Sequence, residues 1–153
     1  MNWIIRNTSK IDFHTNLKKI LKPISTDLDN YNWFLCDLDF ITEKPLPINF
    51  DENFFILKNE DFQKIVNSQT QIIWGVISAV PKNIDIEIDG NDLPFVEGND
   101  LVWKNGNLQV TNSEIEIIAF DSSYTIVKFK SQSLSEKFKN HFDEAIELEK
   151  YKF

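Results

Sequence analysis

The nine residues Ile72–Val80 restrict the possible folds of this chain more than any other segment. Apart from Gly75 and Ser78 they are all apolar, and the run is too short for a membrane-spanning helix, which needs about 20 such residues. A short apolar run rich in branched side chains is typical of a strand whose two faces are both covered. We therefore predict that residues 72–80 form the central strand of a sheet.

Other segments carry strand and hairpin signals. Strands are predicted at residues 2–6, 31–40, 54–57, 115–120 and 124–129. The last two are expected to form a hairpin around Asp121-Ser122-Ser123. A further hairpin is predicted at Asn105-Gly106, between Leu101–Trp103 and Leu108–Val110, because both central residues of a type I′ turn need positive φ.

Three segments have the apolar spacing of helices. The first is predicted over residues 10–21, where Pro23 stops the pattern, and the second over residues 59–67 with Asn59 as its N-cap. A capping box at Ser133-Leu134-Ser135-Glu136 opens a third helix over residues 133–150. Its apolar face is expected to consist of Leu134, Phe138, Phe142, Ala145 and Leu148. The sequence thus predicts a single α+β domain over residues 1–153, with a largely antiparallel sheet and a C-terminal amphipathic helix.

The charge of the chain is unevenly distributed. The net charge is −8, and residues 25–62 and 82–121 each contribute −7. Arg6 is the only arginine, whereas a nucleic-acid-binding surface needs clustered Lys and Arg, so direct nucleic-acid binding is disfavoured. Acidity of this kind favours a basic protein partner, although it can also serve only to keep a small domain in solution.

Two features indicate the compartment. Cys36 is the only cysteine, which excludes an intrachain disulfide and a cysteine zinc site and fits a reducing compartment. The first six residues contain only three consecutive apolar side chains, far fewer than the roughly 7–15 of a signal-peptide core. We therefore expect a cytoplasmic protein that is not bound to a membrane.

No familiar catalytic motif is present. His14 and His141 belong to no metal-binding spacing, no serine lies in a nucleophile elbow, and no glycine-rich phosphate loop occurs, so we predict no catalytic residue, metal or cofactor. Asp37 and Asp39 lie two residues apart on one predicted strand and could hold a divalent metal or share a proton. The alternative is that both acids simply face solvent.

The acidic block at residues 82–121 is the candidate binding surface. Within it, Ile84, Ile86 and Ile88 alternate with acidic residues, and turn-forming residues follow. Aromatic side chains surrounded by polar ones are how protein interfaces concentrate binding energy, although aromatic residues can equally lie in the core. The candidate binding residues are Trp74, Asp85, Glu87, Asp89, Asp92, Glu97, Asp100 and Trp103.

The order of several segments resembles bacterial immunity proteins encoded beside polymorphic or contact-dependent growth inhibition toxins. The resemblance runs over roughly residues 20–151 and rests on core-like and turn-like positions. Its segments are Ile20–Ile24 before Tyr31-Asn32-Trp33, Ile73–Pro81, Glu114–Ile117 leading to Asp121-Ser122-Ser123, Phe138–Phe142 and Leu148–Tyr151. It implies a non-catalytic cytosolic protein that binds a cognate toxin domain, which we expect to be a nuclease, and blocks its active site or substrate path. No site residue is carried over from the resemblance.

The sequence leaves three hypotheses for the function of this protein. In the first, the chain is an immunity protein whose acidic residues meet a basic toxin cleft. In the second, it is a small hydrolase or metal-dependent enzyme that uses Asp37, Asp39 and one histidine, which requires these groups to converge in a pocket. In the third, it is an interaction module for an ordinary cellular protein. The oligomeric state does not follow from the sequence.

Overall fold

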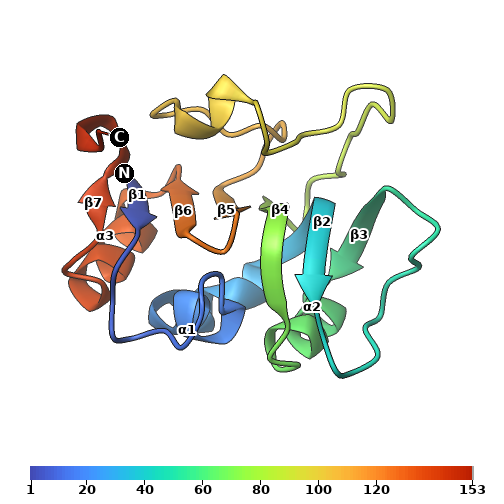
Figure 1. Cartoon of the computed structure of the whole chain (residues 1–153). Coiled ribbons are helices and arrows are strands. Elements are labelled where there is room, and N and C mark those ends of the chain that lie inside the picture. The colour runs from blue at the N-terminus through green and yellow to red at the C-terminus, as the bar shows by residue number, and fades with distance from the viewer. Residues whose placement is uncertain (153) are drawn as a thin grey trace.

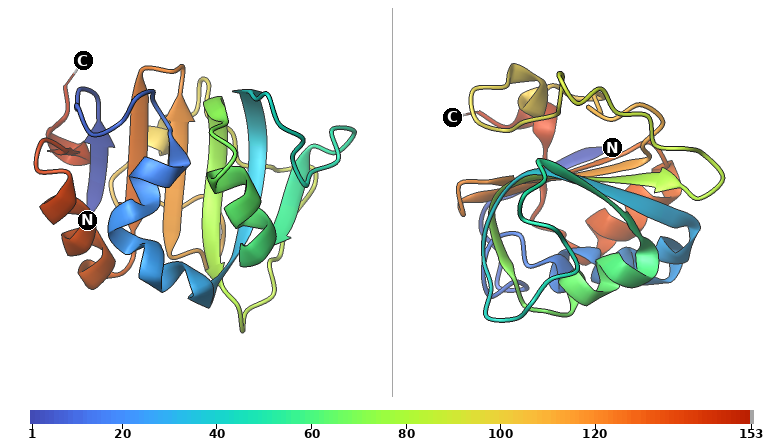
Figure 2. Two further views of the ribbon diagram at one scale, coloured as in Figure 1. Left: turned by 90° about the horizontal axis from the view of Figure 1, so that it is seen from below. Right: turned by 90° about the vertical axis from the view of Figure 1, so that its right-hand side faces the viewer.

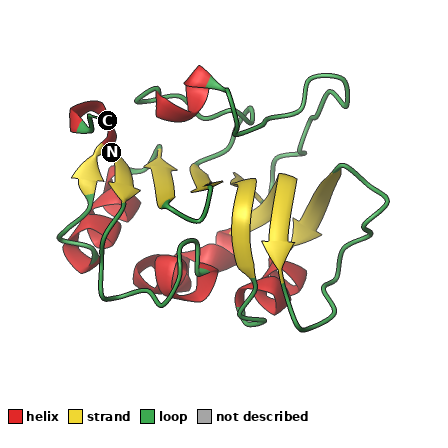
Figure 3. Ribbon diagram, viewed as in Figure 1, coloured by secondary structure: helices red, strands yellow, loops and turns green. Residues whose placement is uncertain are grey.

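The computed structural model describes residues 1–152 and shows one antiparallel sheet between a helix layer and a long covering segment (Figures 1 and 3). The strands are β1 (Asn2–Ile5), β2 (Tyr31–Ile41), β3 (Phe54–Lys58), β4 (Gln71–Pro81), β5 (Ile115–Phe120), β6 (Tyr124–Phe129) and β7 (Ile146–Glu147). The α-helices are α1 (Leu17–Leu21), α2 (Asn59–Val66) and α3 (Gln132–His141), and the 3-10 helices are η1 (Lys22–Asn30), η2 (Asp100–Trp103) and η3 (Leu148–Lys150). The predicted α+β class, antiparallel sheet and C-terminal helix are confirmed.

The sheet has the order β3-β2-β4-β5-β6-β1-β7, and every pair of neighbours is antiparallel. The apolar run Ile72–Val80 lies within β4, between β2 and β5, and most of its side chains are buried. The strand has neighbours on both sides, but it is the third of the seven strands, and the central strand is β5 instead of the predicted residues 72–80. No helix among residues 1–152 is long and apolar enough to cross a membrane.

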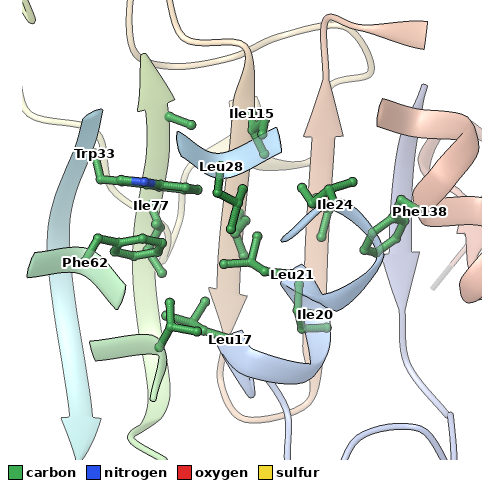
Figure 4. Close-up of a cluster of buried hydrophobic side chains, with 14 of the residues drawn as sticks. Leu17, Ile20, Leu21, Ile24, Leu28, Trp33, Phe62, Ile77, Ile115 and Phe138 are labelled. Carbon is green, nitrogen blue, oxygen red and sulfur yellow. The ribbon is translucent and has the colours of Figure 1, made fainter. Parts of the chain in front are cut away.

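The helix layer covers one face of the sheet and encloses the larger apolar core (Figure 2, left). Figure 4 shows Leu21, Ile24 and Leu28 from α1 and η1 directed toward the strands beneath them. Trp33 of β2 and Phe62 of α2 are both fully buried, and their rings stack with centroids 3.9 Å apart. The ring contact and the buried apolar area fix α2 on the sheet.

The opposite face of the sheet is covered by residues 82–114, which we call the loop layer (Figure 1). Val96, Val102 and Val110 of this layer are buried against sheet residues such as Val76 and Ile118. The loop layer contains η2 but no strand. Ile84, Ile86 and Ile88 are half-buried over this second core, while the acidic residues between them are exposed.

A bulge in β2 changes which residues face each layer. Asp37 has φ of +54°, and the pairing of β2 with β4 shifts register between Cys36 and Asp39. An extra residue in a strand reverses the alternation beyond it. Leu38 and Phe40 therefore pack on the helix side, where Gly75 of β4 leaves room for Leu38, whose Cδ2 would lie 2.8 Å from an added Cβ.

The first predicted helix is much shorter than expected. Thr15 has φ of +54°, and α1 begins only after it, with the Asn16 side chain accepting a hydrogen bond from the Lys19 amide. The chain then continues directly as η1, with Pro23 in the first turn of that helix. The predicted N-cap of α2 is also wrong, because Lys58 occupies that position and Asn59 is the first helical residue.

The hairpin predicted at Asn105-Gly106 does not form. Only Gly106 has positive φ there, and residues 100–103 are the 3-10 helix η2. The hairpin between β5 and β6 does form, and its two central turn residues, Asp121 and Ser122, both have positive φ although neither is glycine. Asp and Ser are among the turn-forming residues, and the strands on both sides are strongly apolar, so packing decides the turn.

The C-terminal helix ends at His141 instead of near residue 150. The Lys139 side chain donates hydrogen bonds to the carbonyls of Asp143 and Ala145, at 2.6 and 2.7 Å, and so holds a non-helical turn. The Lys10 side chain, from the far end of the chain, donates to the His141 carbonyl. Both lysines bind carbonyl oxygens that would otherwise continue the helical ladder.

The chain beyond α3 crosses the edge of the sheet. β7 pairs with β1, where Ile4 lies opposite Ile146. Ala145 is buried on the helix side, whereas Leu148 is buried against the second core on the side of the loop layer. All members of the predicted apolar face are buried, but on two faces of a sheet instead of along one helix.

Candidate functional site

The six predicted acidic binding residues all lie on the outer surface of the loop layer. Each is exposed, and none takes part in the ion pairs found among residues 1–152. Asp89 accepts a hydrogen bond from the Asn91 amide, at 2.9 Å. The loop layer therefore presents carboxylates without a neutralising side chain, and such a surface attracts basic partners. The residues are Asp85, Glu87, Asp89, Asp92, Glu97 and Asp100.

The two predicted tryptophans both contact a third aromatic ring. Trp74 of β4 and Trp103 of η2 lie with their ring centroids 4.9 and 5.0 Å from that of Phe120 at the end of β5. Tyr124 of β6 and Tyr151 of the C-terminal segment complete this aromatic cluster, in which every ring is half-buried. The cluster lies on the same side of the sheet as the loop layer.

The aromatic cluster has charged neighbours of both signs. The Arg6 guanidinium lies 6.0 Å from the centroid of the Tyr124 ring, within the range of a cation–π contact. Asp39 is the cross-strand partner of Trp74, and its side chain is exposed. A half-buried aromatic group with polar residues around it has the composition of a protein-binding surface.

A buried lysine, which the sequence analysis missed, holds the loop layer on the sheet. Lys128 of β6 is fully buried, and its ammonium donates hydrogen bonds to the carbonyls of Leu101, Lys104 and Asn107, at 2.9, 3.3 and 2.9 Å. Its cross-strand partner Glu116, 3.6 Å away, is also fully buried. These three carbonyls therefore bind the ammonium and not the amides of a partner strand.

Glu116 also holds the loop layer. Its carboxylate accepts a hydrogen bond from the Gln109 amide, at 2.6 Å. Burial raises the pKa of Glu116 and lowers that of Lys128, while the attraction between the two groups opposes both shifts. Each strand of this otherwise apolar hairpin carries a single charged residue, Glu116 in β5 and Lys128 in β6. The two opposite charges face each other across the strands, and this was the signal available in the sequence.

Asp37 and Asp39 do not form a catalytic pair with a histidine. Asp37 lies in the bulge, where its Oδ2 accepts a hydrogen bond from the Val96 amide, at 2.8 Å. His14 lies just before α1 and His141 ends α3, and neither lines the pocket that contains Asp37. Within residues 1–152 no three His, Cys, Asp or Glu side chains are grouped so that they could hold a metal ion. The second hypothesis therefore has no assembled site.

Cys36 is buried in β2, and its thiol donates a hydrogen bond to the Pro94 carbonyl of the loop layer, at 3.2 Å. Burial, together with the nearby carboxylates of Asp37 and Glu116, raises the pKa of this thiol to about 12. Thiolate is the reactive form of cysteine. The Cys36 thiol is therefore scarcely reactive in the folded protein.

Alkylation of Cys36 is a direct test of this environment. At pH 8 we expect iodoacetamide to label the native protein on the order of 1,000-fold more slowly than the protein in concentrated urea, because the buried thiol is scarcely ionised. Mass spectrometry of quenched samples gives both rates. Similar rates in the native and unfolded protein would contradict the buried position of the thiol.

Comparison with protein-family models, curated proteins and solved structures finds no match to this chain. The function must therefore be argued from the site alone.

Proposed function

We propose that this protein is an immunity protein that binds a cognate toxin domain and neutralises it by covering the active site or the substrate path. The partner is a basic domain, which we expect to be a nuclease, and the binding surface is the loop layer with the aromatic cluster beside it. The protein acts by binding and not by catalysis.

The observation that carries the proposal is the set of exposed acidic residues on the loop layer, none of them ion-paired among residues 1–152. A nuclease cleft carries positive charge because it holds phosphate, and a surface of opposite sign accelerates association with such a cleft. The aromatic cluster supplies the apolar area that charge alone lacks. Both features lie on one side of the sheet, which allows a single partner to contact them together.

The decisive experiment uses the product of the gene directly upstream. The toxin domain is expressed in a bacterial host with and without this protein, and growth and complex formation are measured. We expect growth only in the presence of this protein, and co-purification of the two chains. The absence of both binding and protection would exclude the proposal, and binding to a non-toxic protein would favour the interaction-module hypothesis instead.

A further inference from the structure

A pocket lined by aromatic side chains and two carboxylates lies at one end of the loop layer. It has a volume of about 410 Å³ and lies between β2, the segment that joins β2 to β3, and residues 93–95 of the loop layer. We call it the Phe50 pocket. Its lining includes Phe40, Phe50, Phe55, Phe95, Asp37 and Glu52.

Two phenylalanines of this pocket are unusually exposed. Phe50 is 69% exposed and Phe95 is 48% exposed, whereas large apolar side chains are normally withdrawn from water. The rings of Phe40 and Phe50 have centroids 5.9 Å apart, so the exposed ring rests against a partly buried one. Exposed aromatic surface around a hollow is typical of a site that a partner covers.

The charge of the pocket selects the occupant. Asp37 and Glu52 are its charged lining residues, and no lysine or arginine lines it. The Asp37 carboxylate is fixed by the hydrogen bond from the Val96 amide, and Glu52 is exposed and forms no ion pair among residues 1–152. A cation placed here would meet two carboxylates and the faces of aromatic rings, and both attract it.

We propose that the Phe50 pocket receives an arginine or lysine side chain of the protein partner, with the aliphatic stem against Phe50 and Phe95 and the charged end at Asp37 and Glu52. That the partner is a toxin rests on the proposed function; the chemistry of the pocket does not. The pocket continues the acidic surface, because residues 93–95 lie between Asp92 and Glu97.

The test uses a short peptide and the isolated protein. The probe is acetyl-Leu-Arg-Leu-amide, and the same peptide with citrulline in place of arginine has the same shape without the charge. We expect the arginine peptide to cause saturable NMR shifts at the backbone amides of Phe50, Asn53 and Phe95. The citrulline peptide is expected to cause none at the same concentration.

Three variants locate the binding. Phe50→Ala is expected to lower the affinity for the arginine peptide about two- to fivefold, which corresponds to the loss of one exposed cation–π contact. Glu52→Gln should weaken it by a similar factor, and Glu136→Gln on α3 is the control with the same change of net charge and no expected effect. Equal shifts with citrulline, or unchanged affinity in the Phe50→Ala and Glu52→Gln proteins, would overturn the assignment. Because no toxin is present in this experiment, its result is independent of the test of the proposed function.

Discussion

Replacing Lys128 with methionine is expected to lower the free energy of unfolding by about 3–5 kcal/mol, the usual cost of removing one partner from a buried ion pair. The substitution leaves the Glu116 carboxylate buried without its cation and leaves the carbonyls of Leu101, Lys104 and Asn107 without their donor. Urea unfolding followed by circular dichroism measures the loss.

The matched control is Lys130→Met, which removes the same charge two residues away from an exposed position. We expect that variant to remain within about 0.5 kcal/mol of the wild type, as surface substitutions usually do. The double variant Glu116→Gln, Lys128→Met should recover part of the stability, because a neutral amide can still accept from the Gln109 amide. A Lys128→Met protein within 1 kcal/mol of the wild type would show, on the scale of a buried pair, that this lysine does not hold the loop layer.

The stability of the Lys128→Met protein should also depend on pH differently from that of the wild type. Burial raises the pKa of Glu116 above its ordinary value of 4.5 in the folded protein, and without Lys128 only the hydrogen bond from the Gln109 amide still opposes that shift. A carboxyl group whose pKa is higher in the folded than in the unfolded protein contributes its stability at pH values below the unfolded-state pKa. This contribution is lost as the pH rises through the folded-state pKa. We therefore expect the deficit of Lys128→Met relative to the wild type to be small near pH 4.5 and to grow toward neutral pH.

Neutralising the loop layer is expected to slow association with the toxin domain by about 10- to 100-fold, with a smaller change in dissociation, because exposed charges act mainly on the encounter rate. The measurement is surface plasmon resonance at several salt concentrations, and the rate of the wild type should fall steeply as salt is added. The substitutions are Asp89→Asn, Asp92→Asn, Glu97→Gln and Asp100→Asn.

A control with the same net charge separates position from total charge. It carries four neutralised acids on other elements, and we expect its association rate to stay within about threefold of the wild type. These substitutions are Asp12→Asn, Glu60→Gln, Asp61→Asn and Glu136→Gln. If the association rate falls by the same factor in both variants, the net charge of −8 acts as a whole and the loop layer is not the contact surface.

The candidate site was predicted in part. The acidic residues and the two tryptophans are visible in the sequence, and the structure places Trp74 and Trp103 around Phe120. The Phe50 pocket was missed, because Phe50 and Glu52 lie in a segment that reads as a loop, and Leu93–Phe95 join them only in three dimensions. The bulge at Asp37 was also missed, because no local sequence pattern announces it.

The sequence by itself determined where most strands occur and which apolar segments are buried, because apolar periodicity records burial directly. Strands β2, β4, β5 and β6 lie close to their predicted ranges, and every residue of the predicted C-terminal apolar face is buried. Only the tertiary structure decided how far the helices extend, which face a residue meets and whether residues 101–110 form a hairpin. Several lysines take part in these outcomes: Lys10 and Lys139 bind backbone carbonyls at and beyond the end of α3, and Lys128 binds carbonyls of the loop layer. A backbone carbonyl pairs with whichever donor the fold brings near it, and that donor can lie more than a hundred residues away.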